Sequence, residues 1–344
     1  MDSALTRIPV DLAGKRAGPI QRNGSLTMVP ILDGALSPSS SSSSSDAAIE
    51  VNSDLVPPLT GLKLSRVAGY GKVEMECLRR ADSGMAIVPL HIGYIQDGAQ
   101  NHAMCRSGLL AAGQKRMFED ACCVQQTQGG YLEGREQWFF ILPLSLRTTA
   151  LEMRGTVSYG KLWPAITRLN EIFGKGSRGH LDEIVCRERP WLTQWNSRLE
   201  RIPNQVGALF LIDGKLVGVE LAPNPTYFAE VWTALVCFCY GVEAMRRETV
   251  AGASVKASDA PGYRATDLAS LRHEVEHRRE LLAAEVTGQL QATPRAKLQL
   301  QEEERLLDVV LSTAKSDHFA GQIVQRRGTT IYASVTATPA WLGA

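Results

Sequence analysis

The chain has 344 residues, of which 44% are hydrophobic and 21% charged, and its formal net charge is +1. This length fits one large domain or two small ones, and the composition is ordinary for a soluble globular protein. The near-zero charge gives no electrostatic case for nucleic acid or for an anionic membrane. No run approaches the roughly 20 apolar residues that span a bilayer, and the N-terminus has no long apolar segment, so we expect neither a membrane span nor a signal peptide.

Cysteine usage indicates a reducing compartment. The chain has seven cysteines, an odd number, and none forms a CxxC pair. Reduced, mostly buried thiols in a cytoplasmic protein fit this pattern best. Cys122 and Cys123 are adjacent in an expected strand, so their side chains should point to opposite faces, one buried and the other open. Cys123 is a candidate nucleophile, a role that requires a neighbouring base or a positive local field.

The beginning of the chain combines a polar start with a serine-rich segment. Residues 1–22 are polar and mixed in composition, and we expect them to be disordered. We expect residues 23–344 to form a single domain that starts with a short strand over Ser25–Leu32. The serine-rich segment 36–58 cannot bury enough apolar area to fold, which predicts a flexible loop inside the domain.

From Leu62 to Leu146 the pattern is mostly that of strands. Apolar or alternating runs predict strands over Lys72–Leu78, Met85–Ile95, His102–Ala111, Gln114–Val124 and Gln137–Leu146. The third and fourth, separated by Gly113, predict a hairpin, and Pro143 favours an edge or a bulge in the last. Helical spacing follows over Ser158–Phe173 and Leu181–Leu199, the second with a possible interruption near Pro190.

The block from Gln205 to Tyr240 predicts a tight hairpin followed at once by a helix. Asp213-Gly214 joins two apolar runs, and this dipeptide suits a type I′ turn because both central residues need φ > 0. Pro225 suits the first turn of a helix, where a missing N–H is harmless. Glu220 is the one acid in the second strand. If its side chain points into a cleft, Glu220 is a candidate catalytic residue. Because side chains alternate between the two faces of a strand, a solvent-exposed position is equally compatible with the sequence.

The last hundred residues predict a helical hairpin and a final pair of strands. Thr266–Leu290 and Pro294–Ala314 form the two expected arms of an insertion over residues 264–316, and strands over Phe319–Val324 and Thr329–Val335 close the chain. Early strands, middle helices, a central hairpin and late strands do not alternate as βαβ units do. This order predicts an α+β fold with a largely antiparallel sheet, packed helices and an inserted helical hairpin.

His273 to His277 matches the HExxH pattern, which in zinc hydrolases places two metal-binding histidines on one helix face with a glutamate as general base. The apolar stripe of this helix (Leu268, Leu271, Val275) is expected to face the partner arm, with both histidines on the opposite side. Neighbouring arginines disfavour Zn²⁺. We therefore predict no metal site. A zinc hydrolase through His273 and His277, with Glu285 or Glu302 as third ligand, is the remote alternative.

Phosphate-cradling motifs are absent from the sequence. It has no GxGxxG or Walker-type loop, and no cofactor is predicted. The segment Gly174–Gly179 (GKGSRG) between two expected helices is either an anion site at a helix N-terminus or a plain loop, and the second interpretation is favoured.

Several segments together point to a known family. In chain order they are SLTMVPIL, GAQNHAM, LLAAGQ, DACCVQQ, SLR at 145–147, a helix with Trp163, and QVGALFLIDGKLVGVEL. With these segments the chain resembles the ARPP domain family, the ADP-ribosylglycohydrolase- and Rhodanese-Phosphatase-superfamily-associated proteins, over about Asn23–Met245 and the last strands. The resemblance implies a context in NAD or ADP-ribose metabolism without an established reaction. This chain departs from the expected motifs at His102 and at Gln125, where an amide cannot replace a titrating acid.

Polar residues in the matched segments are the candidate ligand-binding groups. Gln100 and Asn101 are suited to hydrogen-bond a base or ribose, and Arg147 to clamp a phosphate. His102 is suited to proton transfer near neutral pH. For each residue the alternative is a structural hydrogen bond within the domain.

Two functions are compatible with these features. In the first, the domain binds or processes a nucleotide-like ligand at a cleft that Gln100, Asn101, His102 and Arg147 share. In the second, it is a non-catalytic interaction module that forms a homo-oligomer through the helical hairpin 264–316. Whether any reaction is catalysed is left open.

Overall fold

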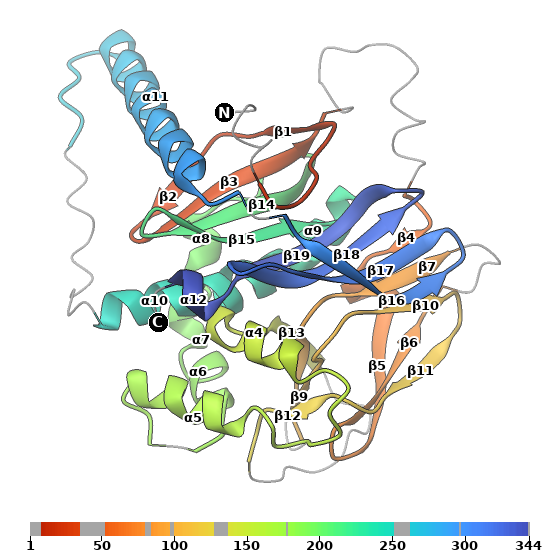
Figure 1. Cartoon of the computed structure of the whole chain (residues 1–344). Coiled ribbons are helices and arrows are strands. Elements are labelled where there is room, and N and C mark those ends of the chain that lie inside the picture. The colour runs from red at the N-terminus through yellow and green to blue at the C-terminus, as the bar shows by residue number, and fades with distance from the viewer. Residues whose placement is uncertain are drawn as a thin grey trace.

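A large antiparallel sheet forms the centre of this α+β protein in the computed structural model (Figure 1). The structure describes residues 8–34, 52–79, 84–96, 100–126, 137–176, 178–250, 262–295 and 297–342. The sheet has nine strands in the order β1-β3-β14-β15-β19-β18-β17-β16, with β2 paired to β3. Their bounds are β1 Lys15–Ala17, β2 Gln21–Asn23, β3 Leu26–Asp33, β14 Gln205–Ile212, β15 Lys215–Leu221, β16 Gln299–Leu306, β17 Val309–Lys315, β18 Phe319–Arg326 and β19 Thr329–Ala337.

Three smaller sheets come from the first half of the chain, with strand orders β10-β7-β4, β11-β6-β5 and β12-β9-β8-β13. The pair β4–β7 is parallel and the other pairs are antiparallel. The bounds are β4 Leu55–Val56, β5 Leu62–Gly69, β6 Lys72–Cys77, β7 Met85–Val88, β8 Ile92–Gln96, β9 His102–Ala103, β10 Gly108–Ala111, β11 Lys115–Phe118, β12 Cys122–Cys123 and β13 Gln137–Ile141.

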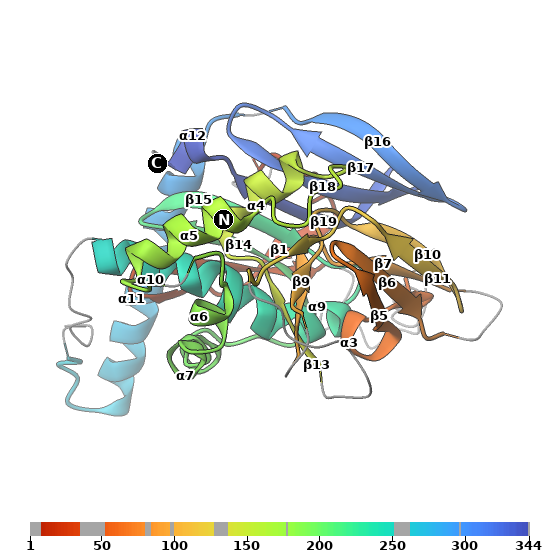
Figure 2. The same ribbon diagram turned by 90° about the horizontal axis from the view of Figure 1, so that it is seen from below.

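Most helices follow β13 in the chain. They are α4 Leu144–Glu152, α5 Trp163–Ile172, α6 Asp182–Val185, α7 Arg189–Leu192, α8 Trp195–Arg198, α9 Pro225–Thr233, the π-helix η1 Ala234–Tyr240, α10 Gly241–Val250 and α11 Leu268–Ala292, with short α3 Pro58–Gly61 and α12 Pro339–Leu342. Figure 2 shows α4, α5 and α6 on one side of the large sheet, and α11 projects away from the body of the molecule in both views.

The central hairpin and the start of its helix are as predicted. Asp213 and Gly214 have φ of 49° and 76°, as a type I′ turn requires. The Asn224 side chain accepts a hydrogen bond from the Tyr227 N–H at 2.8 Å and caps α9, with Pro225 in the first turn. The continuous helix Pro225–Val250 is long and apolar enough to cross a membrane, but 78% of its most apolar window is buried, as in a core helix.

The predicted helical hairpin is wrong in its second arm. The first arm forms α11, whereas residues 299–315 form the strands β16 and β17, joined at Leu307, whose φ is 53°. The spacing of the leucines indicated a helix, but Leu307 lies in an exposed turn. Val309–Lys315 instead forms backbone hydrogen bonds with β18. Without a partner arm, Leu268 on α11 is 84% exposed.

Further predictions about single segments differ from the structure. Residues 8–23 are ordered and contribute β1 and β2 to the large sheet, whereas we expected disorder. The strands flanking Gly113 pair with β7 and β6 and not with each other. Pro143 ends the strand before it, so Leu144–Glu152 is helix α4, and Leu181–Leu199 divides into α6, α7 and α8. Cys122 and Cys123 are both buried, because sheet faces on both sides are covered. Of the segment 36–58, predicted to be a flexible loop, residues 36–51 lie outside the described residues, whereas residues 52–58 contain the buried strand β4, which pairs with β7.

Candidate ligand-binding site

Arg147 and Glu220 form an ion pair in the core, although they are 73 residues apart in the chain. Arg147 Nη1 donates to Glu220 Oε1 at 2.6 Å, and the side chains are 0% and 5% exposed. The Tyr240 hydroxyl donates to the same oxygen at 2.7 Å, and Ser334 Oγ donates to Glu220 Oε2 at 2.6 Å. Glu220 is therefore buried, and its carboxylate accepts three hydrogen bonds from the fold, as a buried charge requires.

The other nitrogens of Arg147 are held within the same network. Nη2 donates to Ser334 Oγ, Nε donates to His91 Nδ1 at 3.1 Å, and Nη1 also lies 3.6 Å from Cys239 Sγ. Burial is the largest single influence on Arg147 and opposes its charge, but Glu220, together with Cys239 and Tyr240, raises the pKa of Arg147 overall. Burial, and then the charge of Arg147, lower the pKa of His91 well below its ordinary value, so His91 is neutral and accepts through Nδ1. Arg147 is thus fully engaged by the fold.

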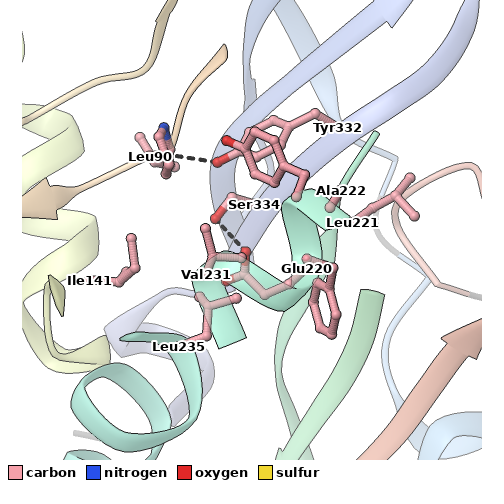
Figure 3. A pocket seen from close by; sticks show the side chains of 12 residues that line it. Leu90, Ile141, Glu220, Leu221, Ala222, Val231, Leu235, Tyr332 and Ser334 are labelled. Atoms are coloured by element: carbon pink, nitrogen blue, oxygen red, sulfur yellow. Dashed lines mark hydrogen bonds between the residues drawn. The ribbon is translucent and has the colours of Figure 1, made fainter. Parts of the chain in front are cut away.

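A small pocket adjoins the ion pair (Figure 3). Glu220 and Ser334 lie on its polar side, and the facing wall includes Ile141, Val231 and Leu235. Its interior of about 20 Å³ has room for about one water molecule. A nucleotide does not fit this space, and we interpret the Arg147–Glu220 network as a structural element of the core.

Four of the predicted site residues lie together at a second place, around the pairing of β9 with β12. His102 is directly opposite Cys123 in this pair. Gln100 Nε2 donates to Cys123 Sγ at 3.2 Å, and the carbonyl of Asn101 accepts from the Val124 N–H at 3.0 Å. Gln100, Asn101, His102 and Cys123 are all buried. The structure therefore groups these four, whereas Arg147 makes its hydrogen bonds with the other network.

Both ring nitrogens of His102 and the thiol of Cys123 have partners in the fold. His102 Nε2 accepts from the Gly71 N–H at 3.3 Å, which places the ring proton on Nδ1 toward the Gln100 carbonyl at 3.2 Å. Cys123 Sγ donates to the Gln125 carbonyl at 2.7 Å, and burial raises the pKa of Cys123. These contacts hold the backbone of three segments together.

The buried His102 predicts a loss of stability in mild acid. Burial lowers the pKa of His102 from its ordinary 6.5 to about 4. Between these values the unfolded state binds a proton that the folded state does not. The stability is therefore full above pH 6.5 and falls toward pH 4, by about 1.4 kcal/mol per pH unit. In urea unfolding we expect His102→Gln to flatten this part of the profile and the exposed His277→Gln to leave it unchanged. An equally steep profile without His102 would assign the sensitivity to other groups, such as His91.

The cluster around His102 supports an exposed pair of tyrosines. The rings of Tyr70 and Tyr159 lie 4.7 Å apart and are 44% and 41% exposed. Tyr70 precedes Gly71, whose N–H donates to His102, and the Tyr159 carbonyl accepts from the Cys123 N–H at 2.8 Å. The buried polar residues thus position an aromatic surface.

An open polar cavity is lined by residues that lie close in the chain to this aromatic pair or to its partners. Its volume is about 630 Å³, and it is lined by Arg106, Met117, Glu119, Asp120, Arg154, Gly155, Val157 and Glu303. Val157 is two residues from Tyr159. On the other side, the Gly71 carbonyl, next to Tyr70, accepts at 3.1 Å from the Ala121 N–H, next to Asp120. The tyrosines therefore neighbour residues of the cavity, although neither tyrosine lines it.

Arg106 is the cation of this cavity with spare hydrogen-bonding capacity. Its Nε donates to Asp120 Oδ2 at 3.0 Å, and its side chain is 25% exposed. Asp120 also accepts from the Gly155 N–H at 2.8 Å, which anchors the carboxylate. No described residue accepts a hydrogen bond from the two terminal nitrogens of Arg106. Arg154, in contrast, is engaged through all three nitrogens by Glu303 and the Leu151 carbonyl.

The HExxH residues lie on α11 among arginine partners. His273 and His277 are exposed on α11, and Glu274 accepts from Arg278 at 2.5 Å. The suggested third ligands are also ion-paired, Glu285 with Arg22 and Glu302 with Arg305. Among the residues that the structure describes, no group of three or more His, Cys, Asp or Glu is placed to hold a metal.

The fold and these sites define an α+β domain with a buried arginine–glutamate core and an open, arginine-lined cavity. The chain belongs to the ARPP-1 family, the ARG and Rhodanese-Phosphatase-superfamily-associated Protein domain, whose family model matches residues 15–336. A search of curated proteins and a search of solved structures found no significant match.

The sequence analysis did not identify Arg106, Tyr70 or Tyr159. Tyr70 and Tyr159 come from separate segments that meet only through the pairing around β12, and no motif marks Arg106. The proximity of Tyr159 to the Trp163 segment of the family pattern was the one available indication.

Proposed function

We propose that this domain binds a nucleotide-like ligand of NAD or ADP-ribose metabolism in the cavity beside Arg106. The observation that carries the proposal is a guanidinium anchored by Asp120 through Nε, with two terminal nitrogens that lack acceptors among the described residues, in an open cavity. A volume of about 630 Å³ lies within the range of about 300–1,000 Å³ of small-molecule sites. The family description, which includes ARG, supports the same metabolic context.

The arrangement suits the two ends of a nucleotide. The terminal nitrogens of an arginine match the oxygens of a phosphate in a bidentate pair. The exposed rings of Tyr70 and Tyr159, which neighbour residues of the cavity, offer a surface on which a base stacks. In this proposal Gln100, Asn101 and His102 act by positioning the tyrosines, a change from the direct ligand contacts that the sequence suggested.

The proposal concerns the binding of a ligand and assigns no catalysed reaction. The acids Asp120 and Glu303 each hold an arginine of the cavity. The seven cysteines are free, which supports the cytoplasmic location that we propose with this function. The alternative of assembly through residues 264–316 loses the paired helices on which it depended, because residues 299–315 are strands.

Isothermal titration with ADP-ribose, ADP and ribose 5-phosphate tests the site. We expect Arg106→Gln to weaken binding of all three by at least about tenfold, since a hydrogen bond to a charged group contributes about 1.5–3 kcal/mol. Tyr159→Leu should weaken ADP-ribose and ADP by about 5- to 150-fold, as stacking contributes about 1–3 kcal/mol per base. It should leave ribose 5-phosphate unchanged.

Two matched variants serve as controls. Arg187→Gln removes an arginine that is 69% exposed and paired with Glu183, and Tyr263→Leu removes a tyrosine that is 55% exposed beside α11. Both should bind as the wild type does. Affinities that do not change in Arg106→Gln, or no binding of any of the three ligands, would exclude this cavity as the nucleotide site.

A further inference from the structure

A small cavity lies where the β14–β15 hairpin meets α10 and α12. Its volume is about 130 Å³, and it is lined by four residues of the hairpin, by Glu243 and Arg247 of α10 and by Leu342 of α12. No residue lines both this cavity and the one beside Arg106, so the two are separate. Acidic and basic side chains occur together in its wall, and their partners decide which charges remain available to a ligand.

The α10 wall carries one net positive charge. Glu243 is 1% exposed, and its carboxylate accepts hydrogen bonds from Arg246 Nε at 2.9 Å and from Arg246 Nη2 at 2.6 Å. Arg247 Nε lies 3.3 Å from the same carboxylate. One carboxylate between two guanidinium groups leaves one positive charge. Arg247 Nη2 donates to the Leu342 carbonyl at 3.2 Å, and its Nη1 has no acceptor among the residues that the structure describes.

The hairpin wall carries one acid and one base. Asp213 occupies the first central position of the type I′ turn, with φ of 49°, and Lys215 begins β15. Lys215 Nζ lies 5.8 Å from the centre of the Trp341 ring, a cation–π distance, and Trp341 Nε1 donates to the Leu216 carbonyl at 2.9 Å. In the described part of the chain, neither Asp213 nor Lys215 has a salt-bridge partner. A negative and a positive charge thus remain available two residues apart.

We propose that this cavity binds a small α-amino acid in its zwitterionic form. The carboxylate of the ligand accepts hydrogen bonds from Lys215 Nζ and Arg247 Nη1, and its ammonium donates to the Asp213 carboxylate. The side chain of the ligand meets the apolar part of the lining, which consists of Ile212, Val217 and Leu342. Each charge of an amino acid therefore has a countercharge in the cavity, and its apolar part has an apolar wall.

Size and charge exclude other ligands. A volume of about 130 Å³ is below the range of about 300–1,000 Å³ of sites for drug-sized molecules, so a nucleotide is too large. A phosphate dianion would meet Lys215 and Arg247 but also the carboxylate of Asp213, which repels it. A zwitterion has no such conflict, so charge complementarity favours the amino acid.

Saturation-transfer NMR of the full chain with L-valine tests the site. We expect saturation of the L-valine methyl protons, because they meet the apolar wall of the cavity. Isovalerate has the carboxylate but lacks the ammonium, and isobutylamine has the ammonium but lacks the carboxylate. Each should bind at least about tenfold more weakly than L-valine, since each lacks hydrogen bonds between charged groups. Displacement of L-valine by inorganic phosphate would instead identify a plain anion site and overturn the proposal.

Two substitutions in the hairpin test the charges one at a time. Asp213→Asn removes the negative charge and keeps the turn, because Asn-Gly suits a type I′ turn as Asp-Gly does. Lys215→Met removes the ammonium and keeps an apolar stem beside Trp341. Each substitution should weaken L-valine binding by at least about tenfold.

Lys315 and Asp317 provide the matched control. They are exposed, lie two residues apart as Asp213 and Lys215 do, and are absent from the lining of the cavity. Lys315→Met and Asp317→Asn should bind L-valine as the wild type does. No saturation of L-valine by the wild type, or equal affinities of the hairpin variants and the control variants, would rule the site out. Neither result bears on nucleotide binding beside Arg106, because the two cavities share no lining residue.

Discussion

Arg147→Met should destabilise the protein by about 3–5 kcal/mol in urea unfolding. The substitution leaves the Glu220 carboxylate buried with its principal countercharge removed, and a charge left uncompensated in a core has a penalty of this size. It also removes the donor to Ser334 and to His91. The network joins α4, β15 and β19, so its loss should lower the midpoint of unfolding for the whole described core.

Two comparisons separate the charge from the lost volume. The double variant Arg147→Met/Glu220→Gln should recover a large part of the loss, because no unpaired charge remains. Arg305→Met breaks an ion pair with Glu302 whose side chains are 58% and 50% exposed, and it should change stability only slightly. If Arg147→Met were as mild as Arg305→Met, the Arg147–Glu220 ion pair would not be the structural element that we describe.

Gly321→Ala should be the most damaging small substitution in the large sheet, with a loss of about 3 kcal/mol. A Cβ at Gly321 would lie 2.1 Å from the Ser334 carbonyl oxygen and 2.6 Å from Val335 Cα. Both atoms belong to the backbone of β19, so no side chain can rotate away and the strands must separate. The shift would also move Ser334, which donates to Glu220.

Gly288→Ala is the control for this prediction. Gly288 lies inside α11, and a Cβ there meets nothing within 4 Å. Alanine is a better helix former than glycine, so the variant should gain about 0.5–1 kcal/mol. Equal effects of the two substitutions on the free energy of unfolding would contradict the contact geometry in β18 and β19.

Local chemistry determined the elements that the sequence predicted well. The Asp213-Gly214 turn, the Asn224 cap with Pro225, and the first turn of α11 each depend on residues within a few positions of one another. Asp267 and Ser270 form a reciprocal capping box at the start of α11. Such contacts form wherever the segment lies. The sequence analysis predicted the turn and the place of Pro225, whereas the Asn224 cap and the capping box were found in the structure.

Tertiary pairing decided the cases in which the sequence misled. Leucine spacing over residues 300–311 is compatible with a helix, but β18 offers the run Val309–Lys315 a ladder of hydrogen bonds that a lone helical arm lacks. From the sequence, the side chain of Glu220 could point either into a cleft or toward solvent. In the structure it is buried, because it pairs with Arg147 of α4.

By itself, then, the sequence determined the α+β class, the central hairpin with its helix and the family to which the chain belongs. Only the tertiary structure separated the predicted site residues into two groups and placed Arg106 in the cavity. The physical reason is that periodicity and turn chemistry act over a few residues. Contacts between Tyr70 and Tyr159, or between Gln100 and Cys123, exist only after distant strands have paired.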